Sequence, residues 1–269
     1  MKLASAKIQF CFPEITHVLR DKRELVKSIL KTMRENGSID YAGYLKDGDL
    51  YKDLLKKIGD VNIRKYQPLN IKQKNYITKV INSTLAKCYR NISDIKNPIF
   101  IFVFPWLPSS KDKKTFKGVN AIAPYKTTIH LFISPYSFTR SSLMETIAHE
   151  FSHLVFYKYQ KAKEYTLFEH IVMEGIAENF REEIIGGKPA AWAVALKKID
   201  AMRIFISLKP LLNSKSVQIR KRVLLGNGKY SRWTGYSIGY WLVKEFREKH
   251  PKINWKDIMQ MEVAKAISR

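Results

Sequence analysis

The sequence predicts an α+β fold that is mostly helical, with a small β-sheet and a helical N-terminal region. Apolar residues recur at helical spacing along most of the chain, whereas Pro98–Pro105 and Thr127–Ser134 are short runs rich in β-branched and aromatic residues. The chain has 269 residues, which suffices for one large domain or for one domain with a helical extension. We place the boundary between a helical region over 1–96 and the main domain over 97–269.

Each element is predicted from its apolar period and its end signals. Asn70 is expected to cap one helix, and Ser141 or Ser142 another. Gly186 is an expected helix stop. Segments 106–118 and 213–232 are expected to be loops. Helices are expected over 14–35, 49–58, 70–91, 141–159, 167–185, 189–212, 234–249 and 255–267.

The formal net charge is +24, from 48 basic and 24 acidic residues, which raises the question of nucleic acid, anionic membranes or acidic substrates. Most of the basic residues are lysines, which solvate a surface, whereas arginine is the preferred partner of phosphates and base edges. One stretch, 201–244, contains no acidic residue. We expect the positive charge to influence substrate choice and do not expect a nucleic-acid partner.

The two cysteines, Cys11 and Cys88, match no zinc-knuckle or redox spacing. Scattered thiols in a chain of this size are typical of a reducing compartment. We find no signal peptide, and the longest uncharged stretches are too short to span a bilayer. The expected location is cytoplasmic.

The segment His149-Glu150-Phe151-Ser152-His153 matches the HExxH pattern inside a predicted helix. Two histidines four residues apart lie on one helix face, one turn apart, and can bind one metal ion. Glu150 points about 100° away from His149 around the helix, where it can reach a metal-bound water. The pattern therefore predicts a mononuclear zinc site, although two histidines with satisfied hydrogen bonds remain the alternative.

A third ligand is expected in the following helix. A metzincin would continue with glycine and histidine where this chain has Phe156 and Tyr159, so that class is excluded. Glu174 lies 21 positions after His153, far enough for a second helix to run back past the metal. A carboxylate third ligand leaves the fourth position open, as a catalytic zinc requires. A solvated helix face is the alternative.

Two neighbours of Glu174 are assigned provisional roles. Glu178, one turn later, is expected to hydrogen-bond a ligand imidazole from outside the ligand set. His170, one turn earlier, is either a rival ligand or a supporting residue. Gly175 is expected to let this helix approach the HExxH helix closely.

These motifs resemble a predicted zinc-dependent protease family often called YjaZ-like. The resemblance covers roughly residues 98–250 and rests on Gly118–Pro135, the HExxH helix, Glu174-Gly-Ile-Ala-Glu178 and Gly235-Tyr-Ser-Ile-Gly-Tyr240. That family is similar to gluzincin metallopeptidases, whose third ligand is a glutamate. Met173 departs from the asparagine that some gluzincins have there. The resemblance implies a zincin-like metallopeptidase domain over 97–269, with one Zn²⁺ per chain and a peptide or protein substrate.

By the same resemblance, Thr127–Ser134 would be the edge strand along which a peptide adds. His130 on that strand would then be a substrate contact or a core residue. In the expected reaction, Glu150 is the general base for a zinc-activated water. Tyr236 is the preferred donor to the oxyanion, and Tyr240 a second candidate that contacts substrate; core packing is the alternative for both.

A different class of function stays open. The protein could be a basic nucleic-acid-binding or nucleic-acid-associated protein with a structural or degenerate metal site. No recognised nucleic-acid motif and no arginine-rich stripe supports that interpretation. Zinc-dependent peptide hydrolysis is therefore the preferred prediction.

Overall fold

The computed structural model of the chain describes residues 6–10, 27, 69–92, 99–106, 110–125, 127–159, 164–260 and 267. The chain divides into two compact units, residues 1–86 with 93–150 and residues 87–92 with 151–269. The helices expected over 14–35 and 49–58 lie outside the described residues, apart from Lys27, as does Cys11. The expected boundary after residue 96 stays a prediction. No helix in the described ranges is long and apolar enough to cross a membrane.

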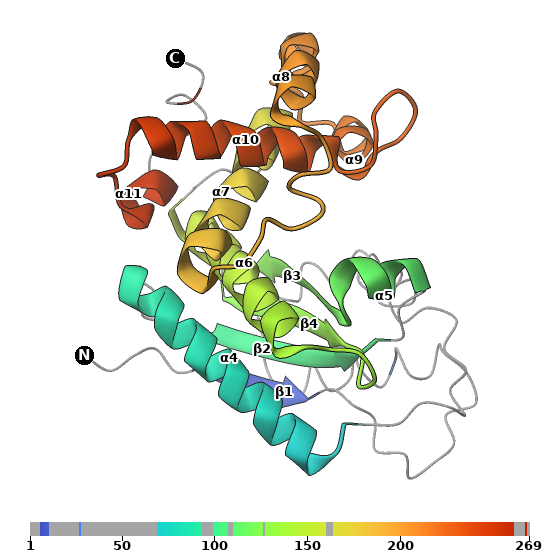
Figure 1. Cartoon of the computed structure of the whole chain (residues 1–269), viewed down its shortest axis with the longest axis vertical. Coiled ribbons are helices and arrows are strands. Elements are labelled where there is room, and N and C mark those ends of the chain that lie inside the picture. Colours follow the sequence, from blue (N-terminus) through green and yellow to red (C-terminus); the bar gives the residue numbers. More distant parts are fainter. Residues whose placement is uncertain are drawn as a thin grey trace. The chain divides into compact units, whose positions relative to one another are not determined.

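The first unit contains a four-stranded mixed sheet with the order β1-β2-β4-β3 (Figure 1). The first three strands in that order are parallel to one another, and β3 runs antiparallel to β4. The strands are β1 Ala6–Phe10, β2 Ile99–Pro105, β3 Val119–Tyr125 and β4 Thr128–Ile133. A small sheet in a mostly helical chain confirms the predicted α+β class.

The sheet corrects two predictions. β4 lies between β2 and β3 and all six of its residues are buried, so the expectation that Thr127–Ser134 is an edge strand is wrong. β1 and β3 were not expected to be strands. Their sequences carry a weak local signal, since β3 includes two alanines and a proline, and both segments become strands by pairing with distant neighbours.

Among the described residues, two helices precede the HExxH segment. Helix α4, Ile71–Asn91, begins as predicted at Asn70, whose side chain accepts a 2.9 Å hydrogen bond from the backbone nitrogen of Gln73. Helix α5, Ser110–Phe116, lies inside the segment expected to be a loop. The ring of Phe116 packs against that of Trp106, at 6.0 Å between centroids, which gives this short basic helix an apolar contact.

Helix α6, Arg140–Tyr159, carries the HExxH segment, and the helix predicted over 141–159 is confirmed. Its start is fixed by Thr139 and not by the expected serines. The backbone nitrogen of Ser142 donates to the Thr139 hydroxyl at 3.1 Å, and the backbone nitrogen of Thr139 donates to the Ser142 hydroxyl at 3.1 Å. Reciprocal bonds of this kind satisfy the free N–H groups of a helix start.

The second unit is built from helices around α7, Leu167–Ile185, and α10, Thr234–Lys249, both of which agree with the predicted ranges. The remaining elements are α8 Lys198–Ser207, the 3₁₀ turn η2 Lys209–Leu211, α9 Val217–Leu225 and α11 Trp255–Gln260.

Two expected boundaries in this unit are wrong. The helix expected from residue 189 begins only at Lys198, because the preceding turn is held by α10: the Leu196 nitrogen donates to the Ser237 hydroxyl, and the Leu196 carbonyl accepts from the Trp241 indole. The segment 213–232, expected to be a loop, contains α9. Its Val223 and Leu224 are buried, and their burial stabilises a helix that the basic local sequence does not predict.

Helices α7 and α10 touch through two glycines. A Cβ atom added to Gly175 would lie 2.1 Å from the carbonyl oxygen of Gly239, and one added to Gly239 would lie 2.0 Å from the carbonyl oxygen of Ile171. Gly175 thus brings α7 against α10, and not against the HExxH helix as expected. The side-chain amide of Asn179 reinforces the crossing by donating to the carbonyls of Gly175 and Tyr240.

Replacing Gly175 with alanine is therefore expected to destabilise the protein by about 1–3 kcal/mol or more, because backbone atoms of two helices must move apart. Thermal unfolding measures the effect. Gly235→Ala is the matched control on α10, since its nearest neighbour is the end of the Leu224 side chain, 2.6 Å away, which can rotate aside. Equal stability of the Gly175→Ala variant and the wild type would contradict this crossing.

Candidate metal centre

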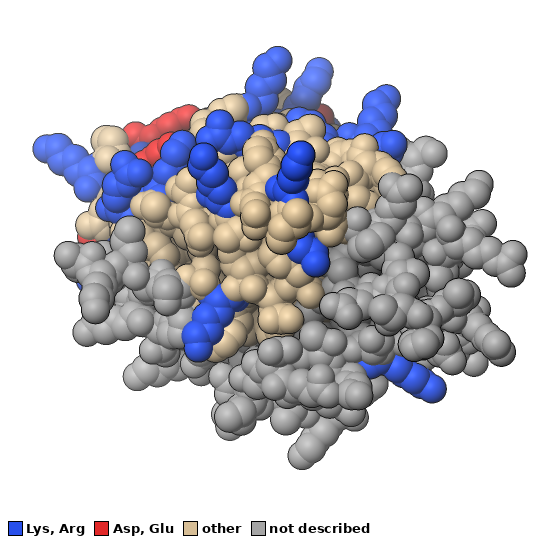
Figure 2. All heavy atoms as spheres, turned by 90° about the horizontal axis from the view of Figure 1, so that it is seen from below, with Lys and Arg blue, Asp and Glu red and all other residues tan. Residues whose placement is uncertain are grey.

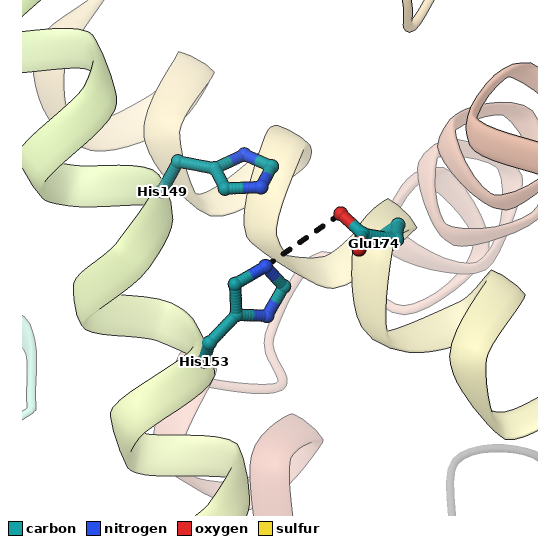
Figure 3. A group of neighbouring side chains, drawn as sticks. All are labelled: His149, His153 and Glu174. Carbon is teal, nitrogen blue, oxygen red and sulfur yellow. Dashed lines mark ion pairs between the residues drawn. The ribbon is translucent and has the colours of Figure 1, made fainter. Parts of the chain in front are cut away.

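Three predicted ligands come together in the structure. His149 and His153 project from one side of α6, and Glu174 reaches toward them from α7 (Figure 3). One ligand atom from each residue lies within 4.8 Å of the other two, and Glu174 Oε2 is 3.6 Å from His153 Nε2. His153 is buried, and the other two are half-buried. These residues form a group that could hold a metal ion.

The donor set fits zinc. Nitrogen and oxygen ligands about 2.0–2.2 Å from a tetrahedral zinc stand about 3.3–3.6 Å apart, so the His153–Glu174 separation already suits a shared ion. Two imidazoles and one carboxylate are also the ligands of a known class of catalytic zinc site.

Glu150 supplies a second test of fit. Its side chain is 6% exposed, yet Oε2 has no hydrogen-bond partner among the described residues. A buried carboxylate oxygen without a donor is costly, and such groups gather where a ligand or reactant is bound. The position of Glu150 next to His149 on α6 therefore agrees with a role toward a bound water.

The position of Glu174 is set by how α7 begins and packs. Thr166 and Glu169 form a capping box: the Glu169 nitrogen donates to the Thr166 hydroxyl at 3.2 Å, and the Thr166 nitrogen donates to the Glu169 carboxylate at 2.7 Å. The ring of Phe180 on α7 stacks on that of Phe151 on α6, at 6.0 Å between centroids. The start of α7 and its packing on α6 thus fix where Glu174 stands.

Glu178 has strong partners near the end of α7. Its carboxylate pairs with Arg181 and accepts a 2.9 Å hydrogen bond from the backbone nitrogen of Ala190. Arg181 in turn donates to the carbonyl of Lys188 at 3.0 Å, and both charged side chains are at most 3% exposed. Glu178 therefore anchors the turn after α7. Its expected role toward His149 or His153 stays a prediction.

The other predicted site residues lie in packed surroundings. His130 is fully buried with its ring against Phe104, and burial lowers its pKa to about 3, which favours the core alternative. Tyr240 is fully buried too, and its hydroxyl donates to Glu182 at 2.8 Å and accepts from Lys244 at 2.8 Å. Tyr236 is half-buried against a cluster that includes Ile171. Their expected roles toward oxyanion and substrate stay predictions.

One pair of residues near the centre was not expected. Arg220 on α9 lies with Nη1 2.7 Å from Nε2 of His170, one turn before Glu174 on α7. An arginine can only donate, so Nε2 of His170 is an acceptor and is already engaged. Burial, with the charge of Arg220, lowers the pKa of His170 to about 4. His170 thus holds Arg220, and it is not part of the ligand group. The one sequence signal for Arg220 was its position in the stretch 201–244, which contains no acidic residue.

Comparison with known proteins gives a consistent result. A family model described as "Predicted Zn-dependent protease" matches residues 77–268. The chain is also 23% identical over 221 residues to "Uncharacterized protein YjfC" of Bacillus subtilis (strain 168), covering 72% of each chain. No solved structure gives a significant match. Because the family model spans more than half of the chain, the protein belongs to the predicted Zn-dependent protease family, as the resemblance of its motifs implied.

Proposed function

We propose that the protein is a zinc-dependent peptidase in which His149, His153 and Glu174 hold the metal and Glu150 is the general base. The convergence of two imidazoles and one carboxylate within 4.8 Å carries this proposal. A set of three protein ligands leaves the fourth coordination position for a reactant, which distinguishes a catalytic zinc from a closed structural one. The gluzincin class follows from the glutamate as third ligand.

The metal, when bound, supplies Lewis-acid chemistry and lowers the pKa of water toward about 7. Glu150 accepts the proton of the attacking water on Oε2 and delivers it to the nitrogen of the leaving amine. Its burial keeps that oxygen away from bulk solvent. Tyr236 is the proposed donor to the developing oxyanion.

We expect the purified protein to contain about one zinc per chain and to cleave casein or members of a peptide library. Removing zinc with a chelator should abolish both the metal content and the cleavage, and adding zinc back should restore them. Elemental analysis and the cleavage assay measure the two quantities on the same sample. A protein that binds no zinc even after reconstitution would contradict the proposed centre.

The competing function is nucleic-acid binding through the positive charge. On the face in Figure 2, Lys and Arg side chains are spread over the described surface, with uncharged surface between most of them. Duplex binding through phosphates requires many basic contacts and falls steeply with salt. A salt-dependent mobility shift with duplex DNA, compared with casein cleavage by the zinc-loaded protein, separates the two functions. Tight, sequence-selective duplex binding at physiological salt would favour the competing one.

A further inference from the structure

Arg220 is held beside the metal centre by a specific contact. Helix α9 is capped by Ser216, whose hydroxyl accepts from the backbone nitrogen of Ile219, and Arg220 lies at the end of the first turn. There Nη1 of Arg220 meets Nε2 of His170 at 2.7 Å. Residues 170 and 174 are neighbours on one face of α7, so the histidine that Arg220 contacts lies one helical turn from Glu174.

The charge of Arg220 is not neutralised where the structure describes the chain. A guanidinium has five N–H donors, and the His170 contact uses one of them with an acceptor that carries no negative charge. No described carboxylate forms an ion pair with Arg220. The nearby Glu169 is engaged in the capping box, and Glu174 belongs to the ligand group.

The location of Arg220 differs from that of the other basic residues on α9. Lys221 and Arg222 are exposed, as expected of solvated charges, whereas Arg220 is half-buried. A half-buried cation without a counter-charge is unfavourable unless an anion binds there. The guanidinium is also the side chain best shaped to bind a carboxylate with two parallel hydrogen bonds.

Aromatic rings connect the metal ligand with this cation. The ring of His153 lies 6.3 Å from that of Tyr157, Tyr157 lies 6.1 Å from Tyr165, and Tyr165 lies 5.7 Å from His170. Tyr157, Tyr165 and His170 are all half-buried, so part of each remains accessible. These partly accessible rings form a row of neighbouring contacts from His153 to the His170–Arg220 pair.

We propose that Arg220 binds a carboxylate of the substrate and that the enzyme therefore prefers peptides with a negative charge close to the scissile bond. This inference rests on the proposed peptidase function and specifies its substrate class. The carboxylate is either an acidic side chain or the C-terminal carboxylate of a short peptide. His170 is the positioning residue that directs the guanidinium.

The test compares matched short peptides with the wild-type, Arg220→Gln and Arg222→Gln proteins, all loaded with zinc. One pair of amidated peptides differs by glutamate against glutamine at positions flanking the scissile bond, and a second pair differs by a free against an amidated C-terminus. The first pair detects an acidic side chain and the second a terminal carboxylate. We expect the wild type to prefer one charged form by about 10- to 100-fold in kcat/KM, as a charge-assisted hydrogen bond allows.

The Arg220→Gln variant should lose this preference, and the Arg222→Gln variant, which removes the same charge from the same helix, should keep it. Zinc content and thermal unfolding check that both variants are folded. Binding of the same peptides to a zinc-loaded Glu150→Gln protein, with and without Arg220→Gln, reports recognition independently of turnover. A wild type without preference, or a preference that survives in the Arg220→Gln variant, would overturn the inference.

The binding assay also separates this inference from the proposed function. Cleavage without any charge preference would contradict the role of Arg220 and leave the peptidase function standing. Binding that depends on Arg220 but is never followed by cleavage in the wild type would contradict the peptidase function and support the carboxylate site. Neither binding nor cleavage of any peptide would overturn both.

Discussion

Replacing Glu150 with glutamine is expected to lower peptide hydrolysis by about 10²- to 10⁴-fold while leaving the zinc content unchanged. The amide has nearly the same shape as the carboxylate, so the buried space around residue 150 stays filled. It cannot accept a proton at neutral pH, however, so the general base is lost. Turnover of a peptide found in the library screen and elemental analysis of the same sample measure the two effects.

Glu145→Gln is the matched control for this experiment. Glu145 is a half-buried glutamate on the same helix α6, one turn before His149, and it lies outside the ligand group. Its replacement removes the same charge and should leave both zinc and turnover close to the wild-type values. Full turnover by the Glu150→Gln protein would remove Glu150 from the role of base.

Helices α6, α7 and α10 could be predicted almost to the residue because their signals are local. The apolar stripe of each recurs with the helical period, the Thr166–Glu169 capping box starts α7, and Gly186 ends it with φ of 82°. The HExxH spacing is local too, since it places two candidate ligands one turn apart on one helix. These features depend on neighbours within about four positions in the chain, which the sequence displays directly.

The strands β1 and β3 could not be predicted in the same way. Ala6–Phe10 becomes a strand by pairing with Ile99–Val103, more than 90 positions away, and β3 depends on its partner β4. Pairing over such distances leaves little trace in the composition of either segment. The interior position of β4 follows from these pairings, whereas the expected edge position rested on the family resemblance.

The surroundings of the metal centre were also only partly predictable. Gly175 was correctly expected to permit a close helix crossing, but which helix it meets is decided by Gly239, 64 positions later. The pairing of Arg220 with His170 spans 50 positions and needs α9, a helix stabilised by the burial of Val223 and Leu224. The candidate ligand group can thus be predicted from spacing, whereas the neighbours of that group are fixed by tertiary packing.

The Glu174→Ala variant is expected to lose zinc binding but to keep its stability, whereas the Glu178→Ala variant is expected to lose stability. Removing Glu174 deletes one of three ligand atoms, so zinc binding should weaken by more than the roughly 10- to 100-fold typical of losing a supporting residue. Glu174 is half-buried, and the described ion pair of its carboxylate is with His153, a member of the same ligand group. The chelated Glu174→Ala protein should therefore unfold at nearly the temperature of the chelated wild type.

The Glu178→Ala protein should instead lose stability. Its replacement leaves Arg181, only 1% exposed, without its carboxylate and removes the acceptor of the Ala190 nitrogen. Breaking a buried ion pair costs about 3–5 kcal/mol, which corresponds to a fall on the order of 10 °C in the unfolding temperature. Glu178→Gln, which keeps an acceptor oxygen there, should be less affected.

Zinc retention under a chelator challenge and thermal unfolding of the metal-free proteins give the two readouts for each variant. If Glu178→Ala loses zinc before Glu174→Ala while remaining as stable as the wild type, Glu178 is the ligand and Glu174 the supporting residue.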